Sequence, residues 1–284
     1  MHQGKNDATI SNVVYPILKY LVSASVILGL FLSACTRGAN SSTQRKDNVL
    51  VVFAAASLID AFQEIGTRFE EQHPGLQVTF NFAGSQQLAQ QISQGAEADV
   101  FASADAESME RVISNGQVVT GSQQVFAQNQ LIVVLPVGST AGIETLAGLA
   151  NPGLRLVFAG EDVPAGKYTR EFLQKASQDP ALGADFEERV QANVISYEAT
   201  VRGVYNKVLL GEADAGVVYQ SDVSGDEDRV DVLEIPPNLN ILAEYYIATT
   251  NIAAQKDLAE AFIQFVLSDE GQQIISSYGF ISIP

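Results

Sequence analysis

From residue 49 onward, short apolar runs alternate with segments of helical periodicity, and this alternation constrains the fold of the chain strongly. After the apolar run 49–55, large apolar residues recur at spacings of four, three and four, namely Leu58, Phe62, Ile65 and Phe69. This spacing predicts a helix with one buried face. Further strand-like runs lie at 77–82, 99–102, 131–135, 154–158, 194–196, 215–219 and 244–249. Helical segments lie at 105–114, 200–210 and 256–267, a further one is opened by 163–166 and runs through 176, and another follows 83–85 and carries Leu88 and Ile92. Alternating strands and helices predict an α/β fold with mainly parallel sheets.

The length of 284 residues exceeds the usual size of a single core, so the sequence favours two lobes. The buried run 131–135 is a candidate crossover into a second lobe, and the segment 244–267 is a candidate return to the first. We therefore expect a first lobe of residues 48–128 and 239–284 and a second lobe of residues 129–238. Two crossings between lobes predict a hinge.

The N-terminal segment is predicted to lie outside that fold. The 13-residue apolar run from Tyr20 to Leu32 is short for a bilayer span and typical of the core of a signal peptide. It ends in Leu-Ser-Ala-Cys, which resembles a bacterial lipobox. That resemblance implies that residues 1–34 are a lipoprotein signal peptide, that Cys35 is lipidated and that residues 35–47 form a flexible tether to the membrane.

Charge and composition exclude several classes of function. The net charge is −17, and it would be −18 without residues 1–34, so nucleic acid is not an expected partner. Cys35 is the one cysteine, and His73 is the one histidine beyond the predicted leader. Histidine-dependent catalytic triads and His/Cys zinc clusters therefore have almost no residues to use. An anion site in so acidic a chain would depend on local dipoles.

The junction between the first strand and the first helix is one place for such a site. Three alanines precede Ser57 there, and small residues at a helix start allow an anion to approach unpaired backbone N–H groups. The alternative is plain helix initiation, because Ser57 followed by Asp60 three residues later also fits a capping box. This junction alone leaves both interpretations open.

Several such turns in order carry a resemblance to a known family. The motifs are Phe-Ala-Ala-Ala-Ser-Leu at 53–58, Phe-Ala-Gly-Ser at 82–85, Ala-Asp-Val-Phe-Ala-Ser-Ala-Asp at 98–105, Val-Pro-Ala-Gly at 163–166, Val-Arg-Gly at 201–203, Gly-Val-Val-Tyr at 216–219 and Tyr-Gly-Phe at 278–280. Together they resemble the bacterial molybdate-binding proteins of ABC importers, over residues 48–283. The resemblance implies a two-lobed, type II periplasmic-binding-protein-like fold with the ligand in the interlobe cleft.

The resemblance also implies the ligand and its site. Molybdate, with tungstate as a second ligand, would be held by neutral donors at five positions: Ser57, Ser85, Ala165, Val201 and Tyr219. Hydroxyls and backbone N–H groups at these positions supply about seven donors. Molybdenum would enter as the oxyanion without a direct protein ligand, and no cofactor is expected. Arg202 is assigned a structural or rim role, and Gln86 and Gln87 lie close enough to add a polar group.

The family further implies an extracytoplasmic, lipid-anchored monomer, not an enzyme, that delivers its ligand to an ABC permease and its cytoplasmic ATPase. The alternatives are sulfate or phosphate as the oxyanion, or ferric ion bound through Tyr245 and Tyr246. Adjacent strand residues point to opposite faces, so this pair is more simply one core and one surface aromatic. A serine hydrolase would need Ser57 as nucleophile and His73 as base, without a Gly-x-Ser-x-Gly context.

Overall fold

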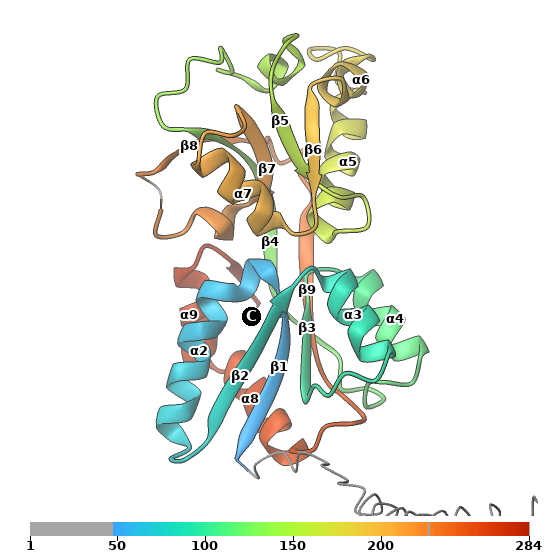
Figure 1. Ribbon diagram of the computed structural model, residues 1–284, viewed down its shortest axis with the longest axis vertical. Helices are drawn as coiled ribbons and strands as arrows, with labels where there is room; N and C mark the ends of the chain where they lie inside the picture. The colour runs from blue at the N-terminus through green and yellow to red at the C-terminus, as the bar shows by residue number, and fades with distance from the viewer. Residues whose placement is uncertain (1–47, 227, 284) are drawn as a thin grey trace, which may run out of the picture. The chain divides into compact units, whose positions relative to one another are not determined.

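The computed structural model describes residues 48–226 and 228–283, whose strands and helices fall into two groups (Figure 1). The predicted signal peptide, Cys35 and the tether lie outside the described residues. The first lobe contains β1 (Val49–Ala55), β2 (Gln77–Ala83), β3 (Val100–Ser103), β9 (Leu242–Thr249) and β10 (Ile281–Ser282), with η1 (Ala56–Leu58), α2 (Ile59–Gln72), α3 (Ser85–Ser93), α4 (Ala106–Ser114), α8 (Lys256–Leu267) and α9 (Asp269–Ser277). The second contains β5 (Leu156–Ala159), β6 (Val194–Glu198), β7 (Ala215–Tyr219) and β8 (Val230–Glu234), with η2 (Leu146–Ala150), α5 (Pro164–Ala176), α6 (Phe186–Gln191), α7 (Val201–Leu209) and η3 (Gln220–Val223).

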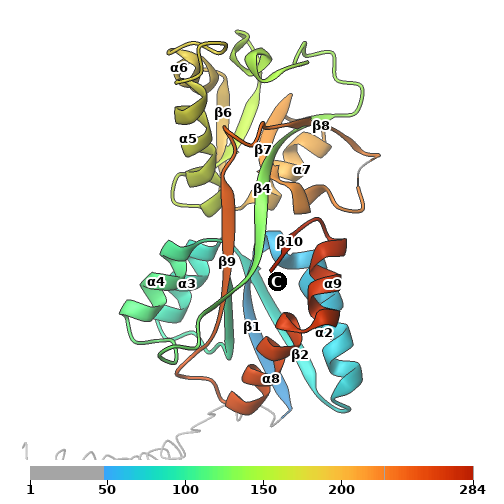
Figure 2. The same cartoon turned by 180° about the vertical axis from the view of Figure 1, so that it is seen from behind.

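One long strand, β4 (Gln124–Pro136), belongs to both lobes. Its first half pairs with β9 as far as Gln130, and its second half pairs with β7 from Leu131 onward. The strand order is therefore β2-β1-β3-β9-β4-β7-β5-β6, with β8 and β10 added along β4. Figure 2 shows β4 and β9 running side by side between the lobes. The two expected crossings are present, whereas the exact boundaries at residues 128 and 238 stay a prediction.

The sheet is mixed, which refines the expectation of mainly parallel sheets. Parallel pairs join β1 to β2 and β3 in the first lobe and β5 to β6 and β7 in the second. Pairs that involve β4, and the pair of β3 with β9, are antiparallel. Helices follow β1, β2, β3, β5 and β6, and a helix can supply the crossover that a parallel pair needs. The two strands that cross between the lobes, β4 and β9, run antiparallel to each other along their shared length.

Helices cover both faces of the first-lobe sheet. One face is covered by α2, α8 and α9, where the predicted apolar stripe of α2 is buried. Phe62 packs 5.6 Å from Phe126 between ring centroids, and Phe69 meets Phe262 edge-on at 5.3 Å. Such aromatic pairs stabilise by about 0.5–1.5 kcal/mol beyond burial. The other face is covered by α3 and α4, which bury Leu88 and other apolar residues against β1 and β3.

The C-terminal ends of the parallel strands all face the junction between the lobes. β1, β2, β5 and β6 each lead at this end into a helix, namely η1 with α2, then α3, α5 and α7. Four helix N-termini therefore converge from two lobes, which is where ligands bind in open α/β sheets. Among the described residues, no helix is both long enough and apolar enough to span a membrane.

Candidate functional site

A small buried cavity lies between the two lobes and brings together all five predicted site residues. It is lined by Ala55, Ala56, Ser57, Gly84, Ser85 and Ala104 of the first lobe and by Val163, Pro164, Ala165, Val201 and Tyr219 of the second. The lining has polar side chains at three positions, all of them hydroxyls, and it includes no acidic or basic residue. A neutral cavity that is surrounded by helix N-termini favours a ligand with many acceptor oxygens.

Ser57 lies in η1 and does not cap a helix, which corrects the capping-box alternative. The cap positions of η1 and α2 are Ala55 and Leu58, and neither helix has a side-chain cap. The chain winds into a 3-10 turn before α2 begins, so Ser57 lies within that turn, one residue ahead of the cap position of α2. Its buried hydroxyl instead lies 2.9 Å from the phenol oxygen of Tyr245.

Tyr245 has a second polar neighbour. The side-chain amide of Asn129 lies 3.5 Å from the Tyr245 phenol oxygen and donates to it. Either hydroxyl can donate in the Ser57–Tyr245 pair, and when the phenol donates, the Ser57 proton is left for a further acceptor. Burial raises the pKa of Tyr245 well above its ordinary value, although the Ser57 and Asn129 hydrogen bonds lower it, so the phenol keeps its proton. A protonated Tyr245 can therefore donate to Ser57, and in that arrangement the Ser57 hydroxyl is a donor toward the cavity.

Ser85 is the first residue of α3, with Gly84 at the cap position. Its hydroxyl oxygen accepts a hydrogen bond of 3.0 Å from the backbone N–H of Ala104. The hydroxyl proton therefore remains available, as does the first-turn N–H, which has no intrahelical acceptor. Ser85 is thus the second hydroxyl donor that the first lobe presents to the cavity, and it is also not an N-cap.

The second lobe contributes the starts of two helices. Ala165 is the second residue of α5, directly after Pro164, and Val201 is the first residue of α7, after the N-cap Thr200. Backbone N–H groups in these positions lack intrahelical partners. Both residues are buried against the cavity, so their N–H groups are held at its wall by the helices themselves.

Tyr219 ends β7, and its buried hydroxyl has no hydrogen-bond partner among the described residues. An unpaired buried hydroxyl costs about 1–3 kcal/mol, so its presence calls for an explanation. Burial raises the pKa of Tyr219 well above its ordinary value, and the nearby Tyr245, Tyr168, Asp105 and Asp222 raise it further. The phenol therefore keeps its proton and is a donor at the cavity wall.

Two polar residues near the motifs, Gln86 and Arg202, contact the opposite lobe. Gln86 lies over Gly84 and its side-chain amide is 3.5 Å from the carbonyl oxygen of Ala199 in the second lobe. A Cβ at position 84 would meet the Gln86 amide at 2.5 Å and the backbone carbonyl oxygen of Ala199 at 2.9 Å, and the contact with the backbone is the one that favours glycine. Arg202 points away from the cavity and forms ion pairs with Asp60 and Asp222, in agreement with the predicted structural or rim role.

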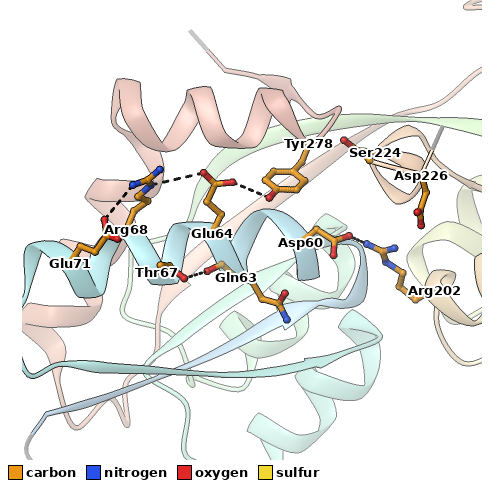
Figure 3. Close-up of a pocket in the computed structure, with 11 residues that line it drawn as sticks. Asp60, Gln63, Glu64, Thr67, Arg68, Glu71, Arg202, Ser224, Asp226 and Tyr278 are labelled. Carbon is orange, nitrogen blue, oxygen red and sulfur yellow. Dashed lines mark hydrogen bonds and ion pairs between the residues drawn. The ribbon is translucent and has the colours of Figure 1, made fainter. Parts of the chain in front are cut away.

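A second, larger hollow of about 680 Å³ lies outside the cavity, along α2 (Figure 3). Charged side chains line it, including Asp60, Glu64 and Arg68, and none of the five predicted site residues does. Arg202 and Asp60 meet at its edge (Figure 3). This groove is solvent-filled surface between charged residues, so the buried cavity is the better candidate for a bare anion.

The geometry does not favour the hydrolase or iron alternatives. His73 follows α2 and its ring bonds the carbonyl of Phe69, so the length of α2, roughly 21 Å, separates it from Ser57. Tyr245 is buried, whereas Tyr246 is partly exposed and donates to Glu244. Within the described residues, no group of three or more His, Cys, Asp or Glu side chains could hold a metal ion.

Comparison with known proteins places the chain in a family. The family model for bacterial extracellular solute-binding proteins matches residues 50–281. The chain belongs to this family. It is thus a solute-binding protein and not an enzyme, and its relatives are extracytoplasmic.

Individual relatives agree with this assignment. This solute-binding protein is 37% identical to the molybdate-binding protein ModA of Mycobacterium tuberculosis, over 92% of this chain and 95% of that one. It is 29% identical to a putative ABC transporter substrate-binding lipoprotein, YvgL, of Bacillus subtilis, over 90% and 95% of the two chains. The periplasmic molybdate-binding protein of Azotobacter vinelandii superposes with a TM-score of 0.71 at 22% identity, over 83% of this chain and 99% of that one, and supports the two-lobed fold.

Proposed function

We propose that this solute-binding protein captures molybdate in the interlobe cavity and delivers it to an ABC importer. The observation that carries the proposal is a buried cavity whose polar groups are all neutral donors, one of them the unpartnered Tyr219 hydroxyl. A fully ionised tetrahedral oxyanion suits such a cavity because it offers only acceptors. The 37% identity to a molybdate-binding protein supports molybdate as that oxyanion.

Five residues would hold the ligand. Ser57 and Ser85 would each supply a hydroxyl and a backbone N–H, Ala165 and Val201 would each supply a backbone N–H, and Tyr219 would supply its phenol. Hydrogen bonds to a charged group contribute roughly 1.5–3 kcal/mol each, so seven such donors support micromolar or tighter binding after ordering and desolvation costs. Molybdenum would contact these residues only through its oxygens.

Closure of the two lobes would complete the site. Donors come from both lobes, so the ligand binds the closed form more tightly than either lobe alone, and this difference is what shifts the opening equilibrium. The lobes would move as residues 48–128 with 239–284 against residues 129–238. The closed, loaded form would dock on a membrane permease that is driven by a cytoplasmic ATPase.

Calorimetric titration of the purified full chain with molybdate, tungstate, sulfate and phosphate tests the ligand. We expect molybdate and tungstate to bind with one site per chain and sulfate and phosphate to bind at least about tenfold more weakly. Phosphate carries a proton near neutral pH, and this cavity offers no carboxylate to accept it. Tighter binding of sulfate or phosphate than of molybdate would refute molybdate as the ligand.

We further propose that Cys35 anchors the protein to a membrane as a lipidated monomer. The lipobox-like tetrad ahead of Cys35 supports this proposal, as does the likeness to a substrate-binding lipoprotein. Cys35→Ser should move the protein from the membrane fraction to the soluble fraction and abolish incorporation of labelled fatty acid. Continued membrane association of the variant would contradict the anchor, and analytical ultracentrifugation tests the monomer.

A further inference from the structure

Two ion pairs join the lobes on opposite sides of the cavity. Arg202 of α7 pairs with Asp60 of α2, and Lys167 of α5 lies 2.9 Å from Glu107 of α4. Figure 3 shows the Arg202 guanidinium turned toward Asp60 across the junction between the lobes. The first pair is the less exposed of the two, with 18% and 38% of the side chains accessible against 38% and 60%. Solvent therefore screens it less.

Arg202 also contacts a fully buried carboxylate within its own lobe. Its Nε atom lies 3.5 Å from Oδ1 of Asp222, and one terminal nitrogen donates to the Asp222 carbonyl oxygen at 3.3 Å. The Nε and Oδ1 atoms are not aligned as a hydrogen bond, and neither has a hydrogen-bond partner among the described residues. The charge of Asp222 is therefore balanced mainly by Arg202.

Asp222 in turn fixes a residue of the proposed site. Its second carboxylate oxygen accepts a hydrogen bond of 3.0 Å from the backbone N–H of Tyr219. Arg202 itself follows Val201, whose N–H lies at the cavity. Arg202 is thus connected to the backbone at two of the three second-lobe positions, Val201 and Tyr219, while a terminal nitrogen of its guanidinium pairs with Asp60 in the first lobe.

We propose that Arg202 is a positioning residue that couples closure of the lobes to the placement of the ligand-binding groups of Val201 and Tyr219. Closure brings Asp60 to Arg202, and the resulting pair holds the α7 start and the Asp222 turn in the binding arrangement. The inference deepens the proposed function and rests on it. The Lys167–Glu107 pair also joins the lobes, but its greater exposure predicts a smaller contribution.

The proposal predicts an effect on the rate at which the ligand dissociates. A pair that forms only on closure slows release of the ligand and leaves the first encounter unchanged. Asp60→Asn should raise the molybdate dissociation rate about threefold to tenfold with an association rate unchanged within about twofold. Arg202→Gln leaves Asp222 buried without its cation, so the increase should be larger, about tenfold to hundredfold. Arg202→Lys keeps a charge that can reach one carboxylate and should give an intermediate rate.

The experiment is stopped-flow binding of sodium molybdate to the purified full chain, followed by tyrosine fluorescence, because the chain contains nine tyrosines and no tryptophan. The matched control is Glu161→Gln, which removes an exposed ion pair with Arg170 that lies wholly within the second lobe. Thermal melts confirm that each variant is folded. Small-angle scattering with and without molybdate should show weaker compaction for Asp60→Asn at subsaturating ligand.

A double variant decides between coupling and independent effects. If Arg202 acts through Asp60, then adding Asp60→Asn to Arg202→Gln changes the dissociation rate no further. Fully additive effects, or wild-type dissociation rates in Asp60→Asn, would overturn the inference while leaving the ligand assignment intact. Binding of tungstate or sulfate in place of molybdate refutes only the ligand, and the same rates are then measured with that anion. Failure of the wild-type chain to bind any of the four oxyanions overturns both proposals.

Discussion

At the scale of single residues, the site depends on hydroxyls whose oxygens are already engaged. Ser85 accepts from Ala104, and Ser57 shares a hydrogen bond with Tyr245 in which either hydroxyl can donate. Ser85 is thereby left with its proton to donate, and so is Ser57 when the Tyr245 phenol donates to it. A cavity of this kind discriminates between ligands by protonation state. It hydrogen-bonds the oxygens of a fully ionised anion, but it has no acceptor for the proton of a protonated one.

Tyr219→Phe tests the unpartnered phenol. The variant loses one hydrogen bond to a charged ligand, so molybdate affinity should fall by about 1.5–3 kcal/mol, roughly 10-fold to 150-fold. The folded state should not be destabilised by more than about 0.5 kcal/mol, because the removed hydroxyl has no protein partner. Calorimetry and a thermal melt measure the two effects, and unchanged affinity would remove Tyr219 from the site.

Tyr245→Phe tests the orientation of the Ser57 hydroxyl. The variant frees the Ser57 proton from its fixed direction, so molybdate affinity should fall about threefold to tenfold. Tyr246→Phe is the matched control, since the partly exposed Tyr246 phenol donates to Glu244 outside the cavity and its removal should leave affinity unchanged. If Tyr245 acts through the Ser57 hydroxyl, then adding Tyr245→Phe to Ser57→Ala should change the molybdate affinity little. Equal losses in the two tyrosine variants would contradict a specific role for Tyr245.

The ordered motifs and the family resemblance that they carry pointed to five residues, and all five lie in the lining of the cavity, while their contact with a ligand stays a prediction. It did not identify Tyr245 or Asn129 as partners of the site, because Tyr245 is 188 positions from Ser57 and no local pattern marks the contact. Alternation along the strand indicated correctly that one of Tyr245 and Tyr246 is buried. The capping pattern at Ser57 and Asp60 was misleading, because Ser57 lies inside a 3-10 turn and Leu58 occupies the cap position of α2.

At the scale of elements, the start of α5 lies very close to the end of β5. A side chain at Gly166 would come within 2.0 Å of the Gly160 carbonyl oxygen and 2.5 Å of that of Ala159. Gly203 occupies the equivalent third position of α7, where an added Cβ would meet only the Glu198 side chain, at 3.2 Å. The two positions therefore differ in whether the neighbouring atoms leave room for a Cβ.

Gly166→Ala should displace the start of α5 and with it the N–H of Ala165. We expect a loss of at least about 2 kcal/mol in the free energy of unfolding and about tenfold weaker molybdate binding. Gly203→Ala should cost less than about 1 kcal/mol, because the nearest contact, the Glu198 Cβ at 3.2 Å, needs a shift of only a few tenths of an ångström and Ala favours the helix. Urea unfolding and calorimetry measure both variants. Equal tolerance of the two substitutions would contradict the close approach of helix and strand.

The turn from β7 into η3 contains a carboxylate with a raised pKa. Burial raises the pKa of Asp222 from 3.8 to about 6, although the Arg202 guanidinium and the Tyr219 N–H lower it. The fold therefore favours the neutral form. This preference stabilises the protein fully below about pH 4 and is lost as the pH rises through about 6, an effect of roughly 3 kcal/mol.

Asp222→Asn tests that dependence, because the variant cannot ionise at this position. As the pH rises from about 4 to 8, the wild-type free energy of unfolding should decline relative to that of the variant. Urea unfolding at several pH values measures the difference between the two curves. Curves that stay parallel over this range would show that Asp222 ionises in the folded chain as it does when unfolded.

The elements that the sequence predicted are those with a strong local period. The helix 256–267 and the strand 215–219 were predicted with the observed bounds, and α2 follows its apolar stripe. The short or polar elements α6, α9, β8 and β10 gave no comparable signal. The first half of β4 alternates weakly, and its pairing with β9 depends on contacts far along the chain, so its full length was not predicted.

At the scale of the whole molecule, an acidic chain presents a neutral site to an anion. The net charge of −17 repels a dianion at long range, while the helix N-termini attract it at short range. The association rate for molybdate should therefore rise about twofold to fivefold as an inert salt is increased from about 0.02 M to 0.2 M. Stopped-flow kinetics measures this rate. A rate that falls with salt would show that the local positive potential of the cleft dominates.

The two-lobed architecture was predictable, whereas the mixed character of its sheet was not. Alternating strands and helices indicate parallel pairs, and those pairs are present in both lobes. Sequence periodicity does not report which way a strand runs beside its neighbour. The antiparallel neighbours arise because β4 and β9 pass between the lobes, and this is a property of topology that becomes visible only in three dimensions.

The paired strands β4 and β9 have a mechanical consequence. A single connecting segment would let one lobe swivel in any direction, but two adjacent connections resist torsion and leave bending across the pair as the easy motion. Opening then has essentially one degree of freedom, and a single distance between the lobes is a sufficient coordinate for it. Fluorescence energy transfer between one donor label on the first lobe and one acceptor label on the second would therefore follow the whole opening cycle.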